Sequence, residues 1–564
     1  MPTIDVDYDE FRKMLGIDLK RNSEKIDEVL AFAKGELKLF DEKTSIMSIE
    51  LKDTNRPDLW NIEGLVRCLR GFLGIDKGLK PYSAGKPLAE VFVDKRLVNI
   101  RPYIGCSIIK NMKLTDPMIR GIMQLQDKLD HTYGRNRRKT SIGLYNFDLM
   151  KPPLSYTVTK PNEISFVPLG FEKKMNLKEI LSEHPKGIEY GSIVSRHSVY
   201  PILVDSEKRV LSFPPIINSN DLGRVTEETR NIIVEVTGTD HETVLNTLKI
   251  VTLSLIDRGG KAYSSVVHYE ENNLTETTPR FNISRMELEV GYANRILDLN
   301  LSAKQIAEML AKAGYGIENL EKNRMIVQIP CYRTDIMHPI DLVEDVAIAY
   351  GYNRIKPFWR ELPTKGCARP EQVFLDAARE LMIGLGFQEV LTYNTTNPEN
   401  LFTRMNMKKQ RIIEIANPKV QTLTCLRNWL LPSLMEFFNC NLHVEYPQRI
   451  FELGPVTVRD KKAETRTRDD FTLAVAVSHP DASFTEIKSA LDTLLMNLGL
   501  SWQIRELKHP SFIDGRVGNV IVEKKEVGLI GEVHPQVLQN WGLQNPVAAF
   551  ELNIDKIQKT WLEH

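Results

Sequence analysis

A proline-containing segment, KPFWRELPTKGCARP at 356–370, divides the chain into two long stretches that both carry the patterns of folded protein. At 564 residues the chain is far longer than one hydrophobic core usually serves, so several domains are expected. Its 42% hydrophobic and 26% charged residues are close to the averages for globular proteins. We therefore predict an α+β multi-domain protein with domains at 1–85, 86–275, 276–355 and 356–564.

Several classes of protein are disfavoured by composition. No apolar run reaches the roughly 18 residues that a membrane-spanning helix needs, and the N-terminus lacks the basic start and apolar centre of a secretory signal. Lys plus Arg and Asp plus Glu are both 74, so the whole chain has no net field to attract nucleic acid. The six cysteines never approach a CxxC spacing, which argues against a zinc ribbon or redox pair. We expect a cytoplasmic protein with no membrane contact and reduced cysteines.

Near the N-terminus, residues 48–75 predict a strand, a turn and a helix with one apolar face. Pro57 suits the first helical position, and Asp58 would lie in the first turn, where the helix dipole favours an anion. We therefore expect the helix to begin at NRPD.

In the second predicted domain, PPIINSNDLG at 214–223 predicts a rigid loop that contains Asn218 and Ser219. A strand follows, in which Ile232, Val234 and Val236 face one way while Ile233, Glu235 and Thr237 face the other. Asp240 is then the expected cap of a helix that runs to about residue 258. The sequence thus places an acid in mid-strand.

A basic run, HTYGRNRRK at 131–139, lies in the same predicted domain. Its plain interpretation is a solvated loop. The sharper one is a contact with RNA phosphates.

The third predicted domain contains a helix with a capping box at Ser302 and Gln305, the strand MIVQIP, and a helix that Pro339 begins and Gly351 ends. This pattern favours a small winged-helix-like module. Beyond the 356–370 segment, we expect a helix through FLDAARELMIGLGF, a strand QEVLTYN at 388–394, and an antiparallel α/β domain to the end of the chain.

Acids gather around the helix that Pro339 begins. Asp341, Glu344 and Asp345 are three and four residues apart and share a face, and Asp335 lies on the chain entering the helix. Such hard oxygen ligands suit Mg²⁺. Acids near a helix start are also stabilised by the dipole without any metal, so both interpretations stay open.

Familiar catalytic motifs are missing from the sequence. It has no GxxxxGK[ST], no GxGxxG, no GxSxG and no HExxH. A chain this large without a legible active site is typical of one subunit of an enzyme whose chemistry lies in another.

Six segments in order together resemble the beta subunit of phenylalanyl-tRNA synthetase, of the archaeal and eukaryotic cytosolic type. They cover nearly the whole chain: NRPDLWNIEGLVR (55–67), FPPIINSND (213–221), RNIIVEVTGTD (230–240), RTDIMHPIDLVEDVAIAYGYN (333–353), RIFELGPV (449–456) and GEVHPQVLQNWGLQNPVAAFELNID (531–555).

The resemblance implies an enzyme of two alpha and two beta subunits that attaches phenylalanine to tRNA(Phe) at the expense of ATP, with ATP bound by the alpha subunit. The C-terminal domain resembles a class II synthetase core, and RIFELG (449–454) is similar to the class II motif in which a strand arginine grips ATP phosphate. No GxGxxER-like third motif follows, so we expect a catalytic-like domain that packs against alpha.

The resemblance also implies an editing domain that hydrolyses tyrosine wrongly attached to the tRNA. Glu235 matches the family's tyrosine-sensing glutamate, while Asn218, Ser219, Thr237 and Asp240 could hold the ester and a water. The family's Mg²⁺ ligands match Asp335, Asp341, Glu344 and Asp345, in a site shared with alpha. The small module is similar to a DNA-binding fold, but its charges are mixed and we infer no DNA binding.

Two other functions fit parts of the sequence. A free-standing aminoacyl-tRNA deacylase would need only the middle domain and no partner. A nucleic-acid-binding regulator would use the winged-helix-like module and bind duplex DNA with a steep salt dependence. Neither accounts for a class II-like C-terminal domain.

Overall fold

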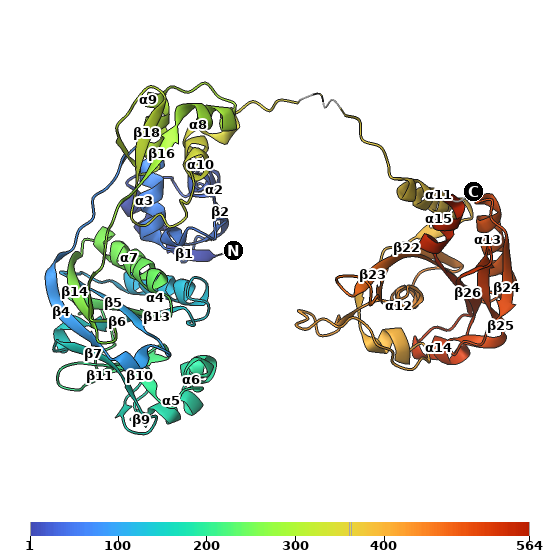
Figure 1. Ribbon diagram of the computed structural model, residues 1–564, viewed down its shortest axis with the longest axis horizontal. Helices are drawn as coiled ribbons and strands as arrows, with labels where there is room; N and C mark the ends of the chain where they lie inside the picture. Colours follow the sequence, from blue (N-terminus) through green and yellow to red (C-terminus); the bar gives the residue numbers. More distant parts are fainter. Residues whose placement is uncertain (1, 360, 362–363, 563–564) are drawn as a thin grey trace. The chain divides into compact units, whose positions relative to one another are not determined.

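The computed structural model describes residues 2–359, 361 and 364–562, and the chain divides into two compact units, Met1–Phe358 and Trp359–His564 (Figure 1). The mixed α/β, multi-domain class is confirmed, because several separate sheets are present. Residues 360, 362 and 363 of the predicted 356–370 segment lie outside the described residues. The finer boundaries at 85, 275 and 355 remain predictions.

Unit 1 begins with a three-stranded antiparallel sheet in the order β1-β3-β2. Its apolar face packs on three helices. The elements are β1 (Thr3–Asp7), α1 (Tyr8–Leu15), α2 (Ser23–Leu30), β2 (Gly35–Asp41), β3 (Ile46–Leu51) and α3 (Ile62–Phe72).

The helix predicted to start at Pro57 starts later. Pro57–Leu59 form a single 3₁₀ turn, and α3 begins at Ile62, after Asn61, whose side chain accepts a hydrogen bond from the Gly64 amide at 3.0 Å. The reason is that Asp58 does not serve the helix dipole. Its two carboxylate oxygens accept a bidentate pair of bonds from Arg56, both at 2.8 Å, and the turn allows this pairing.

The largest sheet of unit 1 has ten strands, in the order β12-β11-β10-β7-β4-β14-β5-β13-β6, with β15 paired to β14. Its pairs are antiparallel except β4 with β14 and with β7. The strands are β4 (Gly85–Val93), β5 (Tyr103–Lys110), β6 (Thr140–Asn146), β7 (Leu154–Thr159), β10 (Tyr200–Val204), β11 (Val210–Phe213), β12 (Ile217–Asn218), β13 (Ile232–Gly238), β14 (Lys261–Tyr269) and β15 (Leu274–Thr278).

Helices cover this sheet (Figure 1). The predicted cap at Asp240 is confirmed, because its carboxylate accepts from the Thr243 amide at 2.9 Å. The covering elements are α4 (Asp116–His131), the short hairpin β8 (Ser165–Phe166) with β9 (Met175–Asn176), α5 (Leu177–Glu183), α6 (Pro185–Tyr190) and α7 (His241–Asp257).

The last part of unit 1 is a three-stranded sheet in the order β16-β18-β17 with three helices on it. The capping box at Ser302 and Gln305 and the helix start at Pro339 are confirmed. The elements are β16 (Ser284–Glu289), α8 (Val290–Leu297), α9 (Ala303–Lys312), β17 (Gly316–Glu318), β18 (Arg324–Ile329) and α10 (Pro339–Tyr350). The winged-helix-like description remains a prediction.

Unit 2 is built on a seven-stranded sheet in the order β19-β22-β23-β27-β26-β25-β24, antiparallel except for β19 against β22. Alternate side chains of β22 and β23 enter two separate cores, one on each face. Its principal elements are α11 (Pro370–Gly384), β19 (Gln388–Glu389), α12 (Leu431–Cys440), β22 (Gln448–Arg459), β23 (Thr467–Ser478), α13 (Phe484–Asn497), β24 (Trp502–Glu506), β25 (Phe512–Val522), β26 (Lys525–Val533), α14 (Pro535–Asn540), β27 (Val547–Asn553) and α15 (Ile554–Leu562).

The strand predicted at QEVLTYN is shorter than expected. Only Gln388 and Glu389 pair with β22, while Leu391 and Tyr393 lie about four-fifths exposed. Among the described residues, no helix is both long and apolar enough to cross a membrane.

Candidate functional site

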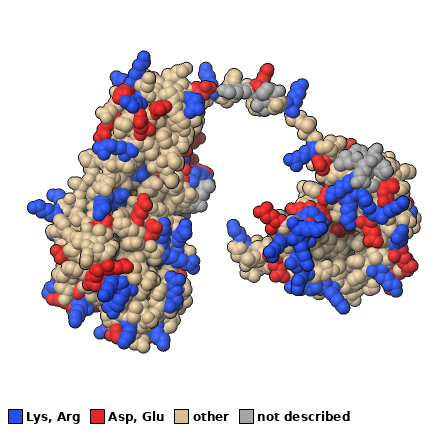
Figure 2. Space-filling model, viewed as in Figure 1, with Lys and Arg blue, Asp and Glu red and all other residues tan. Residues whose placement is uncertain are grey.

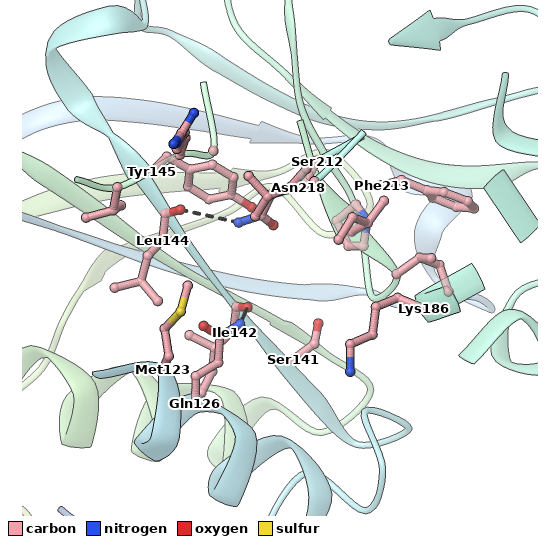
Figure 3. A pocket seen from close by; sticks show the side chains of 18 of the residues that line it. Met123, Gln126, Ser141, Ile142, Leu144, Tyr145, Lys186, Ser212, Phe213 and Asn218 are labelled. Carbon is pink, nitrogen blue, oxygen red and sulfur yellow. Dashed lines mark hydrogen bonds between the residues drawn. The ribbon is translucent and has the colours of Figure 1, made fainter. Parts of the chain in front are cut away.

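A pocket of about 700 Å³ opens beside the ten-stranded sheet of unit 1. This volume lies within the usual range for small-molecule sites. In Figure 3, Met123 and Gln126 of α4 lie across from Tyr145 and Asn218. The lining is mostly apolar, with a few polar groups from α4, β6, β13 and the segment after β11. It includes Ile119, Ile122, Met123, Gln126, Arg137, Ser141, Ile142, Leu144, Tyr145, Lys186, Ser212, Phe213, Pro214, Pro215, Asn218, Asn220, Arg224 and Glu235.

Glu235 enters the pocket from β13, which lies between β5 and β6. It faces Cys106 on β5 and Gly143 on β6 in the register. The predicted alternation is confirmed, since Ile232, Val234 and Val236 belong to one core and Ile233 to the other. Every residue of β13 is buried, however, so Glu235 is an interior acid, only 3% exposed.

The two carboxyl oxygens of Glu235 differ. The Tyr145 hydroxyl donates a hydrogen bond to Oε2 at 2.7 Å, whereas Oε1 is buried and has no donor of normal hydrogen-bond geometry among the described residues. Burial raises the pKa of Glu235 to about 7, and the Tyr145 bond, the Arg101 charge and the nearby Thr237 hydroxyl offset this only in part. A buried acceptor without a partner costs free energy, which a polar group of a ligand could recover.

Asn218 also lines the pocket, and Ser219 lies beside it without lining it. The Asn218 amide donates to the Leu144 carbonyl at 3.3 Å (Figure 3), which orients its side chain. Ser219 is buried, and its hydroxyl accepts from the Leu222 amide at 3.3 Å, so it shapes the turn. The predicted loop residues therefore divide into one pocket residue and one structural residue.

Thr237 and Asp240 are not among the residues that line the pocket, and their role at the ester remains a prediction. The Thr237 hydroxyl accepts from the buried Arg101 guanidinium at 2.9 Å. Asp240 caps α7, and its pKa is lowered chiefly by the bonds it accepts from the Thr243 hydroxyl and amide. Asp240 therefore serves as a helix cap, while the Thr237 hydroxyl contacts both Arg101 and the Glu235 carboxyl, where it offsets part of the rise in pKa that burial causes.

Tyr145 and Ser212 are pocket residues that sequence reasoning missed. Tyr145 is a buried aromatic on β6, a pattern that usually indicates core, and Ser212 is a single hydroxyl in a buried strand. The Ser212 hydroxyl has no hydrogen bond of normal geometry among the described residues, but it lies near Tyr145 and offsets part of the rise that burial causes in the pKa of that phenol. Only the register of β6 against β13, which brings Tyr145 diagonal to Glu235, could have identified the tyrosine.

The basic run at 131–139 is not uniformly a solvated loop. Arg137 is buried, pairs with Asp130 at 3.0 Å, and donates to the Pro215 and Ile216 carbonyls at 3.1 and 2.9 Å. It therefore holds the proline loop that walls the pocket. Arg135 and Arg138 are exposed.

Each of the four acids near α10 is bonded to a cation or to backbone amides. Arg333 bonds both Asp335, at 2.7 Å, and Asp345, at 2.7 Å, and both acids are buried against it. Glu344 accepts from Lys34 at 2.5 Å. Asp341 accepts from the Met337 and His338 amides, each at 2.7 Å, and so caps its own helix.

These partners change the charges that a metal would meet. Burial alone would raise the pKa of Asp335, but the Arg333 and Arg56 guanidinium groups lower it below its usual value. Burial lowers the pKa of Lys34, but the bonds to Glu344 and Asp53 raise it by more, so the pKa lies above its usual value. Within the described part of the chain, no three His, Cys, Asp or Glu side chains are grouped to hold a metal ion. Asp335, Glu344 and Asp345 nevertheless line one small cavity together with Lys34, Arg56 and Arg333, while Asp341 caps its own helix, and the Mg²⁺ site on these four acids remains a prediction.

In unit 2, the arginines near RIFELG are bound to protein groups. Arg449 pairs with Glu486 at 2.8 Å. Arg427, which is buried, donates to Glu452 at 2.8 Å and to the Pro455 carbonyl at 3.0 Å. A methyl group on Gly454 would lie 2.8 Å from Arg427 Nη2, so the Arg427 side chain itself occupies the space beside Gly454.

Comparisons with known proteins all find the same kind of relative. A family described as "Phenylalanyl tRNA synthetase beta chain CLM domain" matches residues 359–554, and one described as "tRNA synthetase B5 domain" matches 286–352. The phenylalanine–tRNA ligase beta subunit of Pyrococcus furiosus is 44% identical over 554 residues, which cover 98% of this chain and 99% of the relative. That of Archaeoglobus fulgidus is 42% identical over 503 residues, which cover 89% and 90%.

A solved structure is also similar. The crystal structure of an N-terminal fragment of the phenylalanyl-tRNA synthetase beta subunit from Pyrococcus horikoshii has a TM-score of 0.60 and 39% sequence identity. The match covers 62% of this chain and all of the fragment, at 100%.

We predict that Mg²⁺ added to chelator-treated protein leaves the thermal unfolding of unit 1 unchanged. Lys34 and Arg333 already neutralise the acids, and an ion that binds only the folded state would raise its stability. Scanning calorimetry over a Mg²⁺ series measures this. A saturable rise in Tm that Asp345→Asn abolishes would show that the metal displaces these cations.

Proposed function

Because the chain belongs to the beta subunits of phenylalanine–tRNA ligase, we propose that it works with an alpha subunit and that the Glu235 pocket removes tyrosine wrongly attached to tRNA(Phe). The observation that carries the editing role is the unpartnered Oε1 of Glu235 in a largely apolar pocket. A phenol is the group that such an acceptor would select.

The physical need for this second site is general. A hydrophobic pocket built for phenylalanine cannot strongly reject an analogue that adds a hydroxyl. A site built to bind that hydroxyl rejects the analogue without it, because its buried acceptor would stay unpaired. Tyrosine would satisfy Oε1 of Glu235, while phenylalanine would leave it unsatisfied.

Other pocket residues suit the remaining parts of an aminoacyl-tRNA end. Met123, Ile142 and Phe213 offer apolar surface for an aromatic ring. Lys186, which pairs with Glu189, and Arg224 supply positive charge for the phosphates of an RNA end, beside the acids Asp127 and Glu172 of the same lining. Across the visible face of unit 1, acidic and basic side chains are interspersed (Figure 2), so these local cations matter more than net charge.

The hydrolytic step needs a water held against the ester carbonyl. Asn218 lines the pocket with a side chain already oriented by the Leu144 carbonyl, and its amide oxygen is the polar group we assign to the ester or the water. Ser219, Thr237 and Asp240 act through structure: a turn, a bond to Arg101, and a helix cap.

The synthetic chemistry is assigned to the alpha subunit, in an assembly of two alpha and two beta chains that binds ATP, Mg²⁺ and tRNA(Phe). The support in this chain is that the arginines near RIFELG already have protein partners. Arg449 pairs with Glu486, and Arg427 pairs with Glu452. The Arg427–Glu452 pair is buried, so that guanidinium is not open to ATP phosphate, whereas the Arg449–Glu486 pair is partly exposed and holds its guanidinium less firmly.

The editing role predicts that Glu235→Ala, in the assembled enzyme, slows hydrolysis of Tyr-tRNA by about 10- to 100-fold, since a hydrogen bond to a charged group contributes roughly 1.5–3 kcal/mol. Phe-tRNA synthesis should stay near the wild-type rate. Deacylation and charging assays on the same preparation measure both.

The matched control is Glu276→Ala. Glu276 is also a buried acid of the ten-stranded sheet, but it pairs with His241 at 2.7 Å and does not line the pocket. If both variants lost editing equally, loss of a buried acid and not of a phenol acceptor would be the cause.

The assignment of synthesis to alpha predicts that the purified chain alone neither exchanges pyrophosphate with ATP in the presence of phenylalanine nor charges tRNA. Addition of the alpha chain should restore both activities. Exchange by the single chain, at a rate that follows its concentration, would place a working ATP site in unit 2.

A further inference from the structure

We infer that Tyr145 and Gly143 on β6 are positioning residues that hold the Glu235 carboxyl in one orientation, with one oxygen bonded inside the protein and the other left for a ligand's phenol. The inference rests on the proposed editing function and deepens it. The phenol of Tyr145 binds one oxygen of the Glu235 carboxyl group, and the phenol of a tyrosyl substrate binds the other. Tyrosine is selected because only its side chain can fill this second position.

The first support is the contact itself. Tyr145 is fully buried, and its hydroxyl donates to Oε2 of Glu235 at 2.7 Å. In the register of β6 on β13, Gly143 is opposite Glu235 and Tyr145 is opposite Ile233, so the phenol reaches Glu235 diagonally. Aromatic side chains are long enough for such diagonal contacts.

The second support is the glycine between them. A Cβ at Gly143 would lie 2.2 Å from the Tyr145 hydroxyl and 2.5 Å from Oε2 of Glu235, closer than real Cβ contacts. Gly143 has no positive φ, so the backbone does not require glycine there. The requirement is space for the hydroxyl–carboxyl pair.

The third support is the unequal state of the two carboxyl oxygens. Without Tyr145, Oε2 would lose its hydrogen bond at 2.7 Å and only the weaker Thr237 contact would restrain the group. With Tyr145, the bond on Oε2 leaves the buried Oε1 as the remaining acceptor of a side chain that lines the pocket. A substrate phenol then meets a pre-oriented acceptor, which lowers the ordering cost of binding.

Tyr145 also acts on the charge of Glu235. A donor bonded to a carboxylate favours its ionised form, and a charged acceptor binds a phenol more strongly than a neutral one. The other titratable groups that interact with Glu235 are Arg101 before β5, Cys106 on β5 and Tyr156 on β7. Of these, only Arg101 carries a positive charge that favours ionisation.

The test is Tyr145→Phe in the enzyme assembled with its alpha subunit. At neutral pH, hydrolysis of Tyr-tRNA should fall by about tenfold. The rising limb of its pH profile should move to higher pH, because loss of the donor raises the pKa of Glu235, and part of the rate should return there. The control, Tyr269→Phe, removes a buried hydroxyl of the same sheet that bonds the Ile104 carbonyl at 2.9 Å, and should change neither rate nor profile.

A second variant, Gly143→Ala, should reproduce the Tyr145→Phe profile by pushing the pair apart. Phe-tRNA synthesis, measured on the same preparations, reports whether each variant has assembled. If Glu235→Ala loses editing while Tyr145→Phe behaves as Tyr269→Phe does, the positioning role is wrong and the proposed function stands. If Glu235→Ala keeps full editing, the proposed function fails and this inference with it.

Discussion

A carboxyl group buried in the middle of a central strand is the constraint on which the pocket depends. Glu235 lies between β5 and β6 with both faces of β13 covered, and burying a charge there is costly unless it is paired. The protein supplies one hydroxyl donor, from Tyr145, and a glycine that makes room for it. The remaining oxygen is buried without a hydrogen bond of normal geometry, which is a cost that a ligand able to donate to it would recover.

Arginine pairing organises a second group of buried charges in unit 1. Arg56 of the NRPD segment bonds Asp58 and lies 3.7 Å from Asp335, and Arg333 bonds Asp335 and Asp345. This network joins two segments almost 280 residues apart in the sequence and connects the first small sheet to α10. Removing one member of such a network typically costs about 3–5 kcal/mol, because the others are left buried without a partner.

Local pattern predicted a good part of this fold. The alternation along β13, the cap at Asp240, the capping box at Ser302 and the start of α10 at Pro339 all depend on neighbours within a few residues. These are features that periodicity and capping chemistry determine. The same short-range reasoning identified Glu235 as the unusual acid of its strand.

Reasoning from local pattern was wrong about the start of α3 and did not reveal the ion pairs around α10. Asp58 bonds Arg56 instead of serving a helix start, so α3 begins four residues after Asp58, at Ile62. Their spacing of three and four residues placed Asp341, Glu344 and Asp345 on one face of a helix. In the structure Glu344 pairs with Lys34, and Asp345 pairs with Arg333. The spacing of acids along a helix predicts which of them lie on the same face. It does not predict which cation they pair with, because that cation comes from another part of the chain.

The most direct measurement is a crystal structure of the assembled enzyme with a non-hydrolysable tyrosyl-adenosine, paired with binding titrations of the tyrosyl and phenylalanyl analogues. We expect the tyrosyl ring to lie in the pocket with its phenol oxygen within hydrogen-bond distance of Glu235 Oε1, while Tyr145 keeps its bond to Oε2. The tyrosyl analogue should bind at least tenfold more tightly than the phenylalanyl analogue, a difference of about 1.4 kcal/mol. Equal affinities, or a phenol oriented away from Glu235, would contradict this expectation.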